Sequence, residues 1–125
     1  MSSSDEELLQ FVAASFPSVW ALEVLLVLRR ERRVWTRTEL LATLRASELV
    51  VSNALDALLA AGLVSIEGDG ALYLPVNAQV ADCVDRIEQL YRRRPNKVRR
   101  AIIAAGASGA AAFADAFKIR RDRDD

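Results

Sequence analysis

Residues 36–75 constrain the fold most, because their local signals predict two helices joined by a tight turn and followed by a β-hairpin. Thr36 and Glu39 have the spacing of a capping box, which begins a helix. Ser47 is placed to cap the second helix. The alternating residues of 63–75 surround a Gly-Asp-Gly turn, which is typical of a hairpin. The sequence therefore predicts a mainly α domain with a small β-hairpin.

Helices are also predicted on both sides of this segment, over residues 4–14, 19–31, 77–93, 96–104 and 110–119. The helix over 19–31 is apolar on nearly every side, so we expect it at the centre of the domain. We expect a short strand at Val34 and Trp35. We also expect Trp20 and Trp35 to be core residues.

These elements predict four segments. Residues 1–17 form an N-terminal helical extension, and residues 18–75 form the central domain with the hairpin. Residues 76–94 form a long amphipathic helix, and residues 95–125 form a basic helical tail.

The long helix carries an apolar seam in which residues recur at alternating steps of four and three. This seam is about two heptads long, enough to pack on the domain or on a second copy. We expect it to mediate homodimerisation. Its members are Val76, Val80, Cys83, Ile87 and Leu90. Cys83 within it is predicted to be an inert buried thiol.

Charge is unevenly distributed along the chain, although the total is zero. Residues 1–90 carry 7 basic and 13 acidic side chains, a net charge of −6, whereas residues 91–125 carry 10 and 4, a net charge of +6. Such a basic tail is expected to bind either phosphate groups or the acidic part of a partner subunit. The arginine-rich run at 29–33 is interpreted as a solvated helix end, with phosphate binding as the alternative.

The composition argues against an enzyme. The chain has no histidine and a single cysteine, so the commonest general base and metal ligand are missing. No catalytic constellation or metal-ligand spacing is found, and no cofactor is predicted. The acidic N-terminus does not resemble a secretory signal, and the longest apolar run, Val24–Leu28, is far too short to span a bilayer. We expect a cytoplasmic protein without a membrane partner.

The segment from Ser47 to Val64 has a serine cap, an inward valine, two inward leucines and a closing Ala-Gly-Leu-Val. It resembles the recognition helix and first wing strand of bacterial winged-helix regulators of the MarR-like and ArsR-like groups. The resemblance covers residues 18–75 and implies a winged helix-turn-helix with extra terminal helices. The tail, with Tyr91–Arg94 and Phe113–Phe117, is similar to small proteobacterial winged-helix proteins of unassigned role.

The resemblance implies that the second helix of the motif reads bases in double-stranded DNA while flanking cations hold phosphates. Ser52 and Asn53 would face bases, and Arg37 and Arg45 would hold phosphates. The implied nucleic-acid-binding residues are Arg37, Arg45, Ser47, Ser52 and Asn53. The tail residues placed for further phosphate contacts are Arg93, Arg94, Lys97, Arg99 and Arg100.

Two functions follow from these observations. The first is a DNA-binding transcriptional regulator that acts as a homodimer. The second is a winged-helix protein-interaction module without DNA binding, because the helix over 48–61 contains no Lys or Arg and carries Glu48 and Asp56. In the second reading, Leu49 and Val50 dock on another protein.

Overall fold

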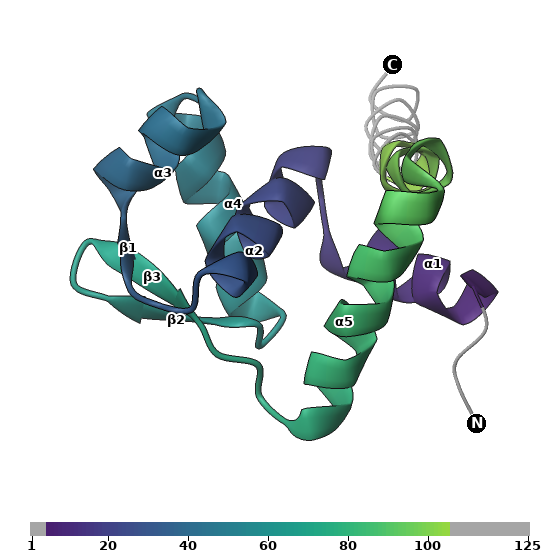
Figure 1. The fold of residues 1–125 in the computed structure, drawn as a ribbon. Helices are drawn as coiled ribbons and strands as arrows, with labels where there is room; N and C mark the ends of the chain where they lie inside the picture. The colour runs from purple at the N-terminus through teal and green to yellow at the C-terminus, as the bar shows by residue number, and fades with distance from the viewer. Residues whose placement is uncertain (1–4, 106–125) are drawn as a thin grey trace, which may run out of the picture.

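The computed structural model describes residues 5–105 as helices packed around a small antiparallel sheet (Figure 1). The fold is mainly α with a three-stranded sheet, which confirms the predicted fold class at this level. The elements in chain order are α1 (Asp5–Ser15), α2 (Val19–Arg30), β1 (Trp35–Thr36), α3 (Arg37–Leu44), α4 (Glu48–Ala60), β2 (Val64–Glu67), β3 (Gly70–Tyr73) and α5 (Ala78–Arg93). Residues 95–105 are also helical. The helix predicted over 110–119 lies outside the described residues.

The predicted capping box at the start of α3 is present. The Thr36 hydroxyl accepts a hydrogen bond from the Glu39 backbone at 3.1 Å, and the Glu39 carboxylate accepts one from the Thr36 backbone at 2.9 Å. The Arg33 guanidinium lies 3.1 Å from the same carboxylate and lowers the pKa of Glu39. Both bonds satisfy backbone or side-chain groups that the helix alone would leave unpaired.

The turn between α3 and α4 is tight. Arg45 caps α3 with a left-handed backbone, at a φ of 53°. Ser47 then caps α4, as predicted, by accepting a hydrogen bond from the Val50 backbone at 3.2 Å. These two residues set the direction in which α4 leaves the turn.

The sheet has the strand order β1-β3-β2. The predicted hairpin is confirmed, and its two-residue loop is Gly68 and Asp69, because Glu67 pairs with Gly70. Gly68 has a φ of 60°, as the first position of a type II′ turn requires. The strand expected at Val34 and Trp35 lies one residue later, at Trp35–Thr36, and it pairs with the start of β3.

One hydrophobic core runs from Leu8 in α1 to Ile102 in the last described helix. As predicted, α2 lies at its centre and packs against α3, α4 and β3, while α1 packs against α5. The members of α2 that are buried are Ala21, Leu22, Val24, Leu25, Leu26 and Leu28.

Trp20 was expected in this core and is instead 40% exposed. Trp20, Glu23 and Val27 are three and four residues apart, so they lie on one face of α2. The helices packed around α2 leave this face partly exposed. Trp35 is buried, as predicted, and its indole donates a hydrogen bond to the Glu31 carbonyl at 2.9 Å.

The predicted seam of α5 is used inside the chain. Ile87 and Leu90 are fully buried in the core, and Val80 and Cys83 pack against its edge. Val76 alone stays largely exposed, at 69%. Of the two uses that the pattern allowed, packing on the domain therefore accounts for Ile87 and Leu90, which have no surface left for a second copy. Homodimerisation itself remains a prediction.

The helix expected from Asn96 begins one residue earlier, at Pro95. Proline suits the first position of a helix because its missing N–H has no partner there in any case. The Arg94 carbonyl accepts a hydrogen bond from the Val98 backbone at 3.3 Å, which closes the first turn.

Candidate functional site

The exposed face of α4 is apolar and acidic. Leu49 is 69% exposed and Leu59 is 48% exposed. Glu48, Asn53 and Asp56 are exposed between them, and Ser52 is half-buried. The opposite face of α4 is buried in the core through Val51, Ala54, Leu55 and Leu58. The exposed face therefore points away from the core. We refer to Glu48, Leu49, Ser52, Asn53, Asp56 and Leu59 as the α4 face.

Two arginines of the α3 segment were predicted to hold phosphates, and only Arg45 lies directly before α4. Arg37 is half-buried at the start of α3, and Arg45 is exposed in the turn before α4. Neither forms an ion pair with any of the described residues. Within the hairpin, Glu67 at the end of β2 and Asp69 in the loop are both exposed. Arg45, Ser47, Ser52 and Asn53 therefore lie in α4 or directly before it, on the element that also carries Glu48 and Asp56, whereas Arg37 lies at the other end of α3.

The basic residues that follow α5 divide into two flanks of one helix. Lys97 lies over α1, in a hollow that it lines with Glu6 and Leu9. Arg99 lies on the other flank, with its guanidinium 5.4 Å from the centre of the Tyr91 ring. Arg100 is exposed one turn beyond Lys97. Lys97 and Arg99 thus do not share one surface.

A shallow hollow connects this second flank to the end of α3. Trp20, Thr43 and Arg99 line it, together with Val19, Glu23 and Leu44. The Tyr91 hydroxyl donates a hydrogen bond to Glu23 at 2.7 Å beneath Arg99, and burial, followed by this bond, raises the pKa of Tyr91. Arg99 therefore lies on the same side of the molecule as the turn that leads into α4.

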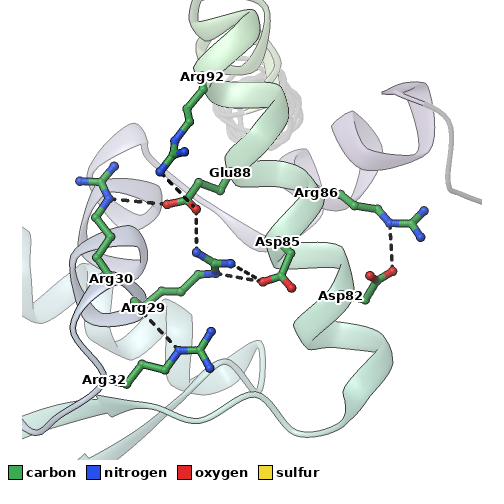
Figure 2. Close-up of polar contacts among 8 residues, drawn as sticks. All are labelled: Arg29, Arg30, Arg32, Asp82, Asp85, Arg86, Glu88 and Arg92. Atoms are coloured by element: carbon green, nitrogen blue, oxygen red, sulfur yellow. Dashed lines mark hydrogen bonds and ion pairs between the residues drawn. The ribbon is translucent and has the colours of Figure 1, made fainter.

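Figure 2 shows that the arginines at the end of α2 hold α5 in place. Arg29 lies between two carboxylates of α5, with its guanidinium 2.5 Å from Asp85 and 2.6 Å from Glu88. Glu88 is only 7% exposed and is also approached by Arg30 at 3.6 Å and Arg92 at 3.7 Å. Arg29 is therefore neither a solvated helix end nor a free phosphate ligand.

Sequence reasoning missed this ion-pair cluster. The available signal was the spacing of Asp85, Glu88 and Arg92, which are three and four residues apart on the helix that carries the buried seam. A buried carboxylate needs charged or hydrogen-bonding partners, and the arginines at the end of α2 were the candidates.

The described residues offer little other chemistry. They contain no group of three or more His, Cys, Asp or Glu side chains placed to hold a metal ion. Cys83 is half-buried, and burial raises the pKa of its thiol, which works against a reactive thiolate. No single helix in residues 5–105 is long and apolar enough to cross a membrane; α1 and α2 reach that length only together, across a bend of 104°.

Comparisons with known proteins do not assign the chain to a family. It matches no protein-family model, no curated protein and no solved structure. What is shown is a small, mainly helical protein with a three-stranded antiparallel sheet, and its further classification rests on its own topology and surface.

Proposed function

We propose that the chain is a winged-helix protein. The element order from α2 to β3 supports this proposal, because a helix, a short strand, two helices and a hairpin follow one another in that sequence. The short strand pairs beside the hairpin in the order β1-β3-β2, so the hairpin extends from the sheet as a wing does. The tight turn between α3 and α4 supports the helix-turn-helix within it.

We propose that this winged helix binds another protein through the α4 face. The observation that carries the proposal is the exposure of Leu49, at 69%, between Glu48 and Asp56 on a helix without Lys or Arg. Exposed apolar side chains with a polar rim are typical of protein interfaces. Duplex DNA would instead require cations, because neutralisation of phosphates supplies most of the affinity.

The first test is affinity capture from an extract of the source organism, with quantification of the retained proteins. We expect Leu49→Asp to lose at least about 90% of a specific partner, since hot-spot residues in interfaces contribute about 2 kcal/mol or more. Leu74→Asp is the matched control, because Leu74 is 56% exposed and lies outside α4. An identical set of proteins on the Leu49→Asp variant would contradict protein binding by this face.

DNA binding as a transcriptional regulator is the second candidate function. The observation in its favour is that Arg45, directly before α4, and Arg37, at the start of α3, form no ion pair in the described part of the chain. Ser52 and Asn53 lie on the same helix at positions from which they would reach bases.

A DNA-binding protein of this kind is expected to retain mixed duplex DNA at low salt and to release it steeply as salt rises. Arg45→Ala is expected to weaken the binding and to lower the salt slope by about one unit, because one phosphate contact is lost. Arg86→Ala, on α5 and paired with Asp82, serves as the control because Arg86 is not among the predicted phosphate contacts. Absence of binding at low salt would exclude this candidate and leave the protein-binding proposal intact.

A further inference from the structure

The α4 face has its charge complement on this same chain. Arg99 and Arg100 are exposed on the helix over residues 95–105, and Ile103, which is 61% exposed, lies one turn further on the same flank. No acidic residue occurs between residues 92 and 105. We refer to Arg99, Arg100 and Ile103 as the basic flank. It offers two cations and an apolar residue, where the α4 face offers two carboxylates and two leucines.

The basic flank lies near the turn that leads into α4, where the α4 face begins. Thr43 and Leu44, at the end of α3, line one hollow with Arg99, and Ser47 caps α4 only three residues after Leu44. In Figure 1, the helix that continues beyond α5 is at the upper right and the turn between α3 and α4 is at the upper left, with the start of α2 between them. Two such surfaces of one chain can meet their counterparts in a second copy across a two-fold axis, so that each contact is made twice.

We propose that the α4 face of one copy packs against the basic flank of a second copy, and reciprocally, to form a homodimer. This inference rests on the same α4 face as the proposed function. It states that a second copy of the chain covers this face when no other protein is bound. The dimer does not use the α5 seam, since Ile87 and Leu90 are buried within the chain. A further protein partner would compete with the second copy for Leu49.

Ionic strength gives the first test, with sedimentation velocity on the full chain. The dimer is expected at about 0.01 M ionic strength and its dissociation constant is expected to rise at least about tenfold at about 1 M, where the screening length falls from about 30 Å to about 3 Å. A monomer of 13.8 kDa at low ionic strength would overturn the inference. The Leu49→Asp capture experiment would be unaffected by that outcome, so the two proposals can fail separately.

Charge reversal gives the second and sharper test. The variants Glu48→Lys/Asp56→Lys and Arg99→Glu/Arg100→Glu are each expected to weaken dimerisation about tenfold or more, because like charges then face one another. Mixing the two variants restores opposite charges at both contacts of a mixed pair. A heterodimer in the mixture, with neither variant dimerising alone, is the expected result.

Matched controls separate this result from a general change of charge. Glu67→Lys/Asp69→Lys reverses two carboxylates at the tip of the hairpin, and Arg93→Glu/Lys97→Glu reverses two cations on the side that faces α1. Both are expected to dimerise like the wild type, and circular dichroism would confirm that all four variants are folded. A dimer that survives reversal of both proposed surfaces, or that is lost equally in the controls, would contradict the arrangement.

Discussion

Gly70→Ala is expected to lower the free energy of unfolding by about 3 kcal/mol or more, toward the upper end of the cost of overpacking. A Cβ at this position would lie 2.2 Å from the backbone oxygen of Trp35 and 2.9 Å from its carbonyl carbon. These are backbone atoms of the neighbouring strand, so β1 would have to move away from β3. Urea denaturation followed by circular dichroism measures the loss, which is a large share of the stability of a small domain.

Gly68→Ala is the control for that measurement. Gly68 has a φ of 60°, but a Cβ there would meet nothing within 4 Å. The substitution is therefore expected to cost about 1–3 kcal/mol, from the positive φ alone. If Gly70→Ala costs no more than Gly68→Ala, β1 does not pair with β3 as closely as described.

Arg29→Ala is expected to cost about 3 kcal/mol of stability, because it leaves the buried Glu88 carboxylate without its closest partner. The Arg29 and Glu88 side chains are 17% and 9% exposed, and the remaining arginines near Glu88 are 3.6 and 3.7 Å away. Those arginines offset part of the loss, which is why the estimate stays at the lower end for a broken buried pair. Thermal and urea unfolding would measure it.

Arg86→Ala provides the comparison on α5. Arg86 pairs with Asp82 one turn away at 2.9 Å, and the Asp82 side chain is 60% exposed. Exposed pairs of this kind contribute about 0.5 kcal/mol. Adding Glu88→Gln to Arg29→Ala is expected to recover part of the stability, because the uncompensated charge is then removed. Equal losses for Arg29→Ala and Arg86→Ala would mean that the ion-pair cluster does not hold α5.

The sequence predicted those features that depend on neighbouring residues. The capping box of Thr36 and Glu39, the Ser47 cap and the hairpin loop are local, and each is present. Most outward positions of α4 were also predictable, because helical periodicity separates Leu55 and Leu58, which are buried, from Asn53 and Asp56, which are not. Leu59 is the exception, since the same spacing predicts that it faces inward and it is 48% exposed.

Features that join distant parts of the chain were not predictable in the same way. The exposure of Trp20 depends on how completely α3 and the last described helix cover α2. The burial of Glu88 depends on Arg29, 59 positions earlier. The approach of Arg99 to the end of α3 depends on the break at Arg94 and Pro95. Periodicity and capping describe single elements and carry no information on these pairings.

Because the backbone at Arg45 is left-handed, thermal stability favours glycine at this position whereas surface charge favours arginine. Among the described residues, it is the one position other than glycine with a positive φ, and a left-handed conformation costs an L-residue about 1–2 kcal/mol. Glycine would relieve that cost and would also remove the cation beside the α4 face. A selection for thermostable variants would therefore enrich glycine at this position, whereas a selection for an anionic partner would retain arginine.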